Sequence, residues 1–209
     1  MRIGKPIALA LATALLVLPS VISCKKAAQQ SESTSGRAAN PYTNESVFDE
    51  VKRKLQENPS DVDLLYHLAE LYDRNAQYKE AIDTYSKVIK LKPGMGYAYL
   101  KMATAYDRMN NPSDAVKTFR EAIKYIPGNP TLYNNMGVAY GKLGKYGEEV
   151  ESLKKAIKLR PNYSAARYNL GMTYLKMKNK KAATKEYEAL KEFDEGAAAN
   201  LLKEIDRAA

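Results

Sequence analysis

The sequence predicts an all-α fold, built as a stack of repeated helical hairpins. Two observations support this: prolines recur every 34 residues, and each interval holds two stretches whose large apolar residues fall three or four positions apart. The composition agrees, because 45% of the residues are hydrophobic and the 209-residue chain has only 11 Gly and 9 Pro. A chain of this length suits one extended core with appendages.

The repeat is visible in several sets of residues that share the 34-residue period. Each set keeps one kind of residue at one place: a proline, a large aliphatic residue, a small residue, a tyrosine, and a second small residue. Several sets in one register do not arise by chance, so the repeat is a unit of structure. The sets are Pro59, Pro93, Pro127 and Pro161; Leu68, Met102, Met136 and Leu170; Ala69, Ala103, Gly137 and Gly171; Tyr72, Tyr106, Tyr140 and Tyr174; and Ala81, Ala115, Glu149 and Ala183.

Each repeat is expected to form two antiparallel helices. In the first repeat, apolar residues form one helical face over residues 61–76 and another over residues 78–91. The small residues Ala69 and Ala81 let the two helices approach closely. Pro93 follows the second helix and cannot continue it, so it fixes the turn into the next repeat. Each hairpin leaves an apolar face open, and neighbouring hairpins must stack to cover it.

Two further helices are expected outside the full repeats. Residues 44–58 carry an apolar stripe before Pro59 and should pack as a half-repeat helix. Residues 196–209 should form a capping helix, with Leu201, Leu202 and Ile205 turned inward over the last open face.

The first 23 residues have the layout of a secretory signal. Arg2 and Lys5 precede an uncharged apolar run from Ile7 to Leu18. This run is shorter than the roughly 20 residues that a membrane-spanning helix needs, although a permanent span stays an alternative. The folded part is expected to begin at residue 44, after a tether over residues 24–43 that is too poor in large apolar residues to fold.

The end of the signal, Val21-Ile22-Ser23-Cys24, resembles the lipobox of bacterial lipoproteins. The resemblance implies cleavage before Cys24 and acylation of that residue, so that the chain is held in a bacterial envelope membrane by its N-terminal acyl chains. Lys25 in place of Asp favours the outer membrane over the inner one, by the sorting rule of enteric bacteria. The alternative is a soluble secreted protein with a spare thiol.

The repeats themselves resemble the tetratricopeptide repeat, which has the same length and the same series of large, small, tyrosine, alanine and proline positions. The resemblance implies a right-handed α-solenoid of four helix-turn-helix units. These units would occupy residues 62–95, 96–129, 130–163 and 164–195 of a domain that spans residues 44–209.

The family pattern also implies a partner-binding groove lined by the first helix of each repeat. Asparagine amides suit an extended peptide backbone, and tyrosines offer apolar area with a polar tip. An acidic or neutral polar peptide is therefore expected across repeats two to four, with a bulkier residue entering the room that Gly141 leaves beside Asn134. The groove residues are Tyr66, Glu70, Lys101, Arg108, Asn134, Asn135, Lys142, Tyr168, Asn169 and Lys176. The family's carboxylate clamp is echoed only at Asn135 and Lys101, which speaks against capture of a free C-terminus.

Charge is unevenly distributed within a formal net charge of +9. Residues 45–83 hold ten acidic and five basic side chains, net −5, whereas residues 142–185 hold twelve basic and three acidic ones, net +9. In an exported protein, the basic C-terminal half suits an anionic lipid or an acidic envelope polymer, and nucleic acid is not an expected partner. The alternatives are a merely solvated surface and a protein-docking site on the outer lysines, Lys154, Lys155, Lys158, Lys180 and Lys181.

Glu149 interrupts the repeat, because it stands where the helix crossing favours Ala. One interpretation is that Gly137 makes room for the Glu149 stem while the carboxylate reaches solvent. The alternatives are a hinge or an ion pair with a nearby lysine.

No catalytic or metal site and no cofactor is predicted. His67 is the only histidine and lies within an ordinary repeat, and phosphate-loop, zinc-protease and EF-hand motifs are absent from the sequence. The predicted function is a non-enzymatic, membrane-anchored scaffold that binds a protein or peptide and assists assembly of an envelope complex. The alternatives are an accessory ligand-binding protein of an envelope transport system and, more remotely, an enzyme.

Overall fold

The computed structural model describes residues 44–208, which belong to one compact unit. The predicted signal, the tether and Cys24 lie outside the described residues. Within the described part there are ten helices and no strand, which confirms the predicted all-α solenoid of four hairpins with a half-repeat helix before them and a cap behind them. The helices are α2 Asn44–Glu57, α3 Val62–Arg74, α4 Tyr78–Leu91, α5 Gly96–Arg108, α6 Pro112–Tyr125, α7 Pro130–Lys142, α8 Tyr146–Leu159, α9 Ser164–Lys176, α10 Lys180–Lys191 and α11 Glu195–Arg207.

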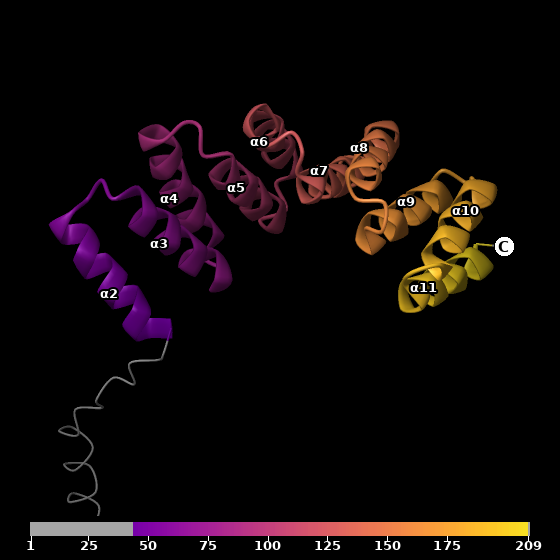
Figure 1. The fold of residues 1–209 in the computed structure, drawn as a ribbon, viewed down its shortest axis with the longest axis horizontal. Coiled ribbons are helices and arrows are strands. Elements are labelled where there is room, and N and C mark those ends of the chain that lie inside the picture. Colours follow the sequence, from indigo (N-terminus) through magenta and orange to yellow (C-terminus); the bar gives the residue numbers. More distant parts are fainter. Residues whose placement is uncertain (1–43, 209) are drawn as a thin grey trace, which may run out of the picture. The chain divides into compact units, whose positions relative to one another are not determined.

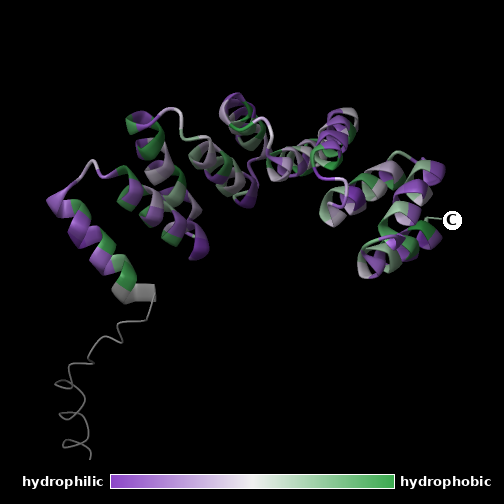
Figure 2. Ribbon diagram, in the orientation of Figure 1, coloured by the Kyte–Doolittle hydropathy of each residue, from purple (hydrophilic) through white to green (hydrophobic). Residues whose placement is uncertain are grey.

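The helices pack in chain order as a curved stack (Figure 1). The second helices α4, α6 and α8 follow the outside of the curve, and the first helices α3, α5, α7 and α9 follow the inside. We call the surface formed by α3, α5, α7 and α9 the inner face. Hydrophobic and hydrophilic residues alternate along the helices (Figure 2), as expected for helices that bury one face against their neighbours.

Two turns recur in each repeat, one between successive repeats and one between the two helices of a hairpin. Helices α2, α4, α6 and α8 each end two residues before a proline of the 34-residue series, the first of these at Pro59. Within each hairpin, the turn holds a residue with positive φ at the same position. The backbone N–H of the next residue donates to the carbonyl of the tyrosine that lies two residues before the end of the first helix. Only one of these four positions, Gly144, has the residue best suited to that conformation.

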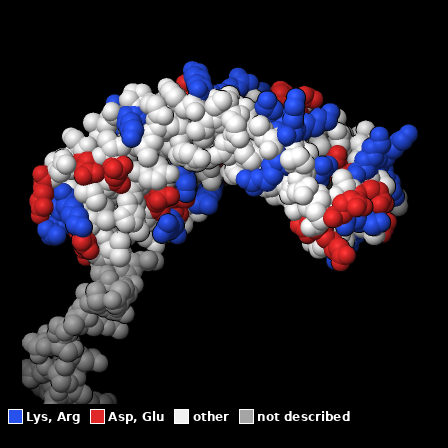
Figure 3. All heavy atoms as spheres, viewed as in Figure 1, with Lys and Arg blue, Asp and Glu red and all other residues white. Residues whose placement is uncertain are grey.

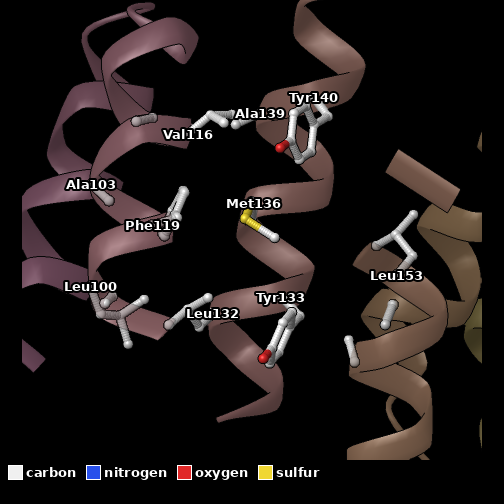
Figure 4. Packing of buried hydrophobic residues seen from close by; sticks show 14 of the residues in the cluster. Leu100, Ala103, Val116, Phe119, Leu132, Tyr133, Met136, Ala139, Tyr140 and Leu153 are labelled. Atoms are coloured by element: carbon white, nitrogen blue, oxygen red, sulfur yellow. The ribbon is translucent and has the colours of Figure 1, made fainter. Parts of the chain in front are cut away.

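The core runs through the stack as a chain of side-chain layers. Between the second and third hairpins, Leu100 and Phe119 meet Leu132 and Met136, as Figure 4 shows. The alanines at the helix crossings, Ala81, Ala115 and Ala183, have no exposed surface, as expected where two helices approach closely. At the C-terminal end, Leu201 of α11 fills the space beside Gly171 and so covers the last hairpin. Leu201 and Ile205 are buried as expected, but the prediction for Leu202 was wrong, because its side chain is exposed.

Candidate functional site

All ten residues predicted to line a groove lie on the four helices of the inner face. They do not form one uniform surface. Tyr66 packs edge-on against the buried Tyr85 ring, with centroids 5.6 Å apart. Burial, with smaller contributions from Glu70 and Tyr97, raises the pKa of Tyr66 to about 12. Tyr168 packs against the cluster beneath the capping helix. These two tyrosines therefore contribute to the core as well as to the inner face.

Three of the four predicted groove cations are held by carboxylates of the preceding repeat. Lys101 Nζ lies 3.0 Å from Glu70 Oε1. Arg108 Nη1 lies 2.7 Å from Asp73 Oδ1, and Lys142 Nζ lies 2.8 Å from Asp107 Oδ1. These ion pairs tie each first helix to the next one along the inner face.

The sequence prediction did not include Asp73 and Asp107. The sequence spacing could have predicted both ion pairs, because each aspartate precedes its cation by 35 residues, which is one repeat plus one position. In a stack of 34-residue units, that spacing places the two side chains on adjacent first helices.

The predicted asparagines form a hydrogen-bonded chain between α7 and α9. Asn169 Nδ2 donates to Asn134 Oδ1 at 3.1 Å, and Asn134 Nδ2 donates to Asn135 Oδ1 at 3.1 Å. Asn134 is buried in the middle of this chain. Among the described residues, the Asn135 Nδ2 donor at one end and the Asn169 Oδ1 acceptor at the other make no further hydrogen bond.

Glu149 departs from the first interpretation made from the sequence. Its carboxylate does not reach solvent, since the residue is only 4% exposed. A Cβ at Gly141 would lie 2.6 Å from both carboxylate oxygens, so the group fills the space that Gly141 leaves. Gly137 instead faces Leu153 and the Glu149 backbone. The extra room expected beside Asn134 for a ligand side chain is thus already occupied.

The surroundings of Glu149 favour the neutral acid. Burial raises its pKa above the ordinary value, and this outweighs the lowering effects of the neighbouring Thr173 hydroxyl and of the Lys176 charge. The Thr173 hydroxyl donates to the Asn169 carbonyl at 2.7 Å, so its lone pairs remain to accept from a protonated carboxyl. Glu149 Oε2 is buried and has no hydrogen-bond partner among residues 44–208.

Three sequence models described as tetratricopeptide repeat match residues 74–136, 130–163 and 152–186, and together they cover more than half of the chain without a gap. The chain is a tetratricopeptide repeat protein. No curated protein matches its sequence.

Solved tetratricopeptide repeat structures share the fold. MamA from Desulfovibrio magneticus RS-1, residues 41 to the end, superimposes with a TM-score of 0.70 and 19% identity, over 82% of this chain and 94% of that one. YrrB, "a TPR protein with an unusual peptide-binding site", gives a TM-score of 0.66 and 20% identity, over 77% and 84%. The first TPR of Spaghetti (RPAP3), bound to the HSP90 peptide SRMEEVD, gives 0.55 and 23%, over 56% and 93%.

The outer surface of the repeats carries the exposed lysines that form the alternative site. Lys154 Nζ lies 3.8 Å from Glu151 Oε1, and Lys155 Nζ lies 5.9 Å from the centre of the Tyr133 ring. Lys158, Lys180 and Lys181 make no ion pair within residues 44–208. Lysine and arginine side chains gather along the outside of the curve in the C-terminal half (Figure 3).

No group of three or more His, Cys, Asp or Glu residues between 44 and 208 is arranged to hold a metal ion. None of the helices described here has the length and apolar character needed to cross a bilayer. An open cleft of about 520 Å³ lies at the turn between repeats two and three, where Tyr97, Tyr125 and Arg160 contribute to its lining.

Proposed function

We propose that this tetratricopeptide repeat protein is a scaffold that binds an extended segment of a partner protein on its inner face. The observation that carries the proposal is the asparagine chain on α7 and α9. It presents the Asn135 Nδ2 donor and the Asn169 Oδ1 acceptor, while the buried Asn134 fixes the position of both amides. An extended backbone offers the complementary carbonyl and N–H groups.

The solved relatives support this assignment. YrrB has an unusual peptide-binding site, and the first TPR of RPAP3 binds an HSP90 peptide. Both are built on the same fold as the present chain. Binding of a peptide requires no catalytic group, so the proposed function is non-enzymatic.

The experiment is a substitution of both end asparagines by alanine. Asn135→Ala/Asn169→Ala removes the Asn135 donor and the Asn169 acceptor, together with both hydrogen bonds of Asn134, and should weaken binding of a blocked peptide by about 1–3 kcal/mol. Peptides selected from a random array on the wild-type protein serve as probes, and calorimetry measures their affinity. Asn200→Ala, an exposed asparagine on α11, is the control and should bind as wild type does. Unchanged affinity in the double variant, measured below its melting temperature, would remove the groove assignment.

The outer lysines are the competing docking surface. A variant with Lys154, Lys155, Lys158, Lys180 and Lys181 replaced by glutamine keeps the inner face intact. Loss of partner binding in that variant alone would place the site on the outside of the stack. The same variant tests the anionic-lipid proposal, through its binding to vesicles that contain an acidic phospholipid.

We further propose that the scaffold is held in the bacterial envelope by acyl chains on Cys24, with the outer membrane favoured over the inner one. The support is the sequence alone: the charged start, the short apolar run and the lipobox-like Val21-Ile22-Ser23-Cys24. Metabolic labelling with palmitate should mark the wild-type protein and fail to mark Cys24→Ala. A Cys24→Ala protein that stays in the membrane fraction with its signal uncleaved would show that the apolar run is itself the anchor.

Assistance in assembling an envelope complex is the role that follows from an anchored peptide-binding scaffold. The alternative, an accessory ligand-binding protein of an envelope transport system, would be favoured by an enclosed pocket. The cleft beside Tyr97 and Tyr125 is open to solvent, which suits the scaffold better. Crosslinking in intact membranes, followed by mass spectrometry, would identify the partner.

A further inference from the structure

The ion pairs on the inner face follow a rule that the third repeat breaks. In the first two repeats, an aspartate near the end of the first helix reaches the cation 35 residues later, as Asp73 does for Arg108 and Asp107 does for Lys142. The same step ends at Lys176, but the residue 35 positions before it is Gly141. Lys176 therefore lacks the aspartate that holds the other two cations.

Glu149 has taken the place of that missing side chain. Position 149 corresponds to Ala81 and Ala115 in the first two repeats, so an Asp–Ala combination has become Gly141–Glu149. Since a Cβ at Gly141 would lie 2.6 Å from the Glu149 oxygens, the carboxylate occupies the volume where the aspartate would begin.

This exchange changes what Lys176 can do. The carboxyl group of Glu149 now lies in the core, where burial favours its neutral form. Within the described residues, Lys176 makes no ion pair, and its Nζ lies 5.8 Å from the centre of the Tyr146 ring. Lys176 itself is exposed, so its ammonium is accessible from solvent.

We infer that Lys176 is the point at which the inner face recognises an acidic side chain of its ligand, and that the Gly141–Glu149 exchange keeps this cation available. The inference rests on the proposed peptide-binding function and names the chemistry of the peptide. Asn169 and Lys176 are seven residues apart on α9, about 10.5 Å along the helix axis. Because an extended chain rises about 3.3 Å per residue, the acidic residue should lie within about three residues of the backbone that Asn169 binds.

Two variants make the Lys176 charge unavailable to a ligand, one by removing it and one by pairing it with a carboxylate. Lys176→Gln removes the charge from an exposed position, where the substitution should not disturb folding. Gly141→Asp/Glu149→Ala restores the combination of the first two repeats and gives Lys176 an aspartate partner. Lys154→Gln removes a lysine of the outer surface and is the matched control for net charge.

The probe is an array of blocked heptapeptides in pairs that differ only by Glu or Gln at one position. The wild-type protein should prefer the Glu member of its bound pairs by about threefold, the size expected for a partly exposed ion pair. In Lys176→Gln and in the double variant the ratio should fall to about one. Lys154→Gln should keep the wild-type ratio.

The outcomes distinguish a failure of the Lys176 inference from a failure of the proposed peptide-binding function. If the array peptides bind and depend on Asn135 and Asn169, but the Glu preference survives in Lys176→Gln, the groove function stands and the role of Lys176 is wrong. If no array peptide binds the wild-type protein, the proposed function fails and the inference falls with it. A double variant that does not fold leaves the decision to Lys176→Gln.

Discussion

Leu201→Ala should loosen the C-terminal end of the stack while leaving the other end intact. Leu201 has no exposed surface, and its methyl groups fill the space beside Gly171, where a Cβ would lie 2.5 Å from Leu201 Cδ2. Truncation therefore leaves a cavity between α11 and α9, which the fixed helix backbones close only in part. A fully buried leucine of this kind contributes about 3 kcal/mol, within the usual range of 2–5.

Hydrogen exchange read helix by helix is the assay, because each hairpin contacts only its neighbours and stability is local in such stacks. Protection in α9–α11 should fall about a hundredfold, which corresponds to roughly 3 kcal/mol at 1.4 kcal/mol per factor of ten. Protection in α3–α6 should not change. The adjacent Leu202 is 37% exposed, so Leu202→Ala should cost under about 1 kcal/mol. Equal loss of protection from α3 to α11 would refute the reasoning, because the stack would then unfold as one unit.

Three further predictions concern turns, protonation and ion pairs. Ala76 and Lys178 have φ values of 58° and 57°, a backbone conformation that favours glycine. Replacing either residue with Gly should therefore raise the free energy of unfolding by up to about 1 kcal/mol, whereas Gly144→Ala should lower it, and thermal unfolding measures both effects. Glu149 has a raised pKa in the folded state, so that state holds more protons than the unfolded one between the two pKa values. The free energy of unfolding should then fall as pH rises through that window, and Glu149→Gln should remove this slope in urea titrations at different pH. The Arg167–Glu186 pair is only 20% and 16% exposed, so Glu186→Gln should cost about 1 kcal/mol. Glu151→Gln, in a pair with Lys154 whose two side chains are 79% and 54% exposed, should have no measurable effect.

The fold was predictable because periodic positions carry most of its information. The prolines and the paired apolar faces determine where each hairpin begins and ends, and the structure places α3 to α10 accordingly. The helix ends depend on local chemistry that the sequence also contains. Asp61 accepts from the backbone N–H groups of Asp63 and Leu64, and Asn129 does the same for Thr131 and Leu132.

The sequence predicted which residues lie on the inner face, but it did not predict which of the cations are held in ion pairs. The repeat pattern places Arg108 and Lys142 on first helices. Whether these cations are available to a ligand depends on Asp73 and Asp107, which lie one repeat earlier and form ion pairs with them. The groove prediction treated the cations as free because it considered each repeat by itself. In a solenoid, the side chains of one repeat are partners of the next, so the charge that a ligand meets is what remains after these contacts are counted.

Glu149 shows why a single exception to the repeat could not be interpreted alone. The sequence shows a glutamate at an alanine position, which suggests a charge that must reach solvent. The decisive fact is that Gly141 stands on the facing helix at an aspartate position, so the side chain has room inside the stack. Two departures from the pattern, eight residues apart, thus compensate each other: one vacates a volume and the other fills it with the same chemical group. The carboxyl group is retained near Lys176, but it is buried. Of the four predicted groove cations, Lys176 is thus the one that has no ion pair among the described residues and can meet a ligand carboxylate.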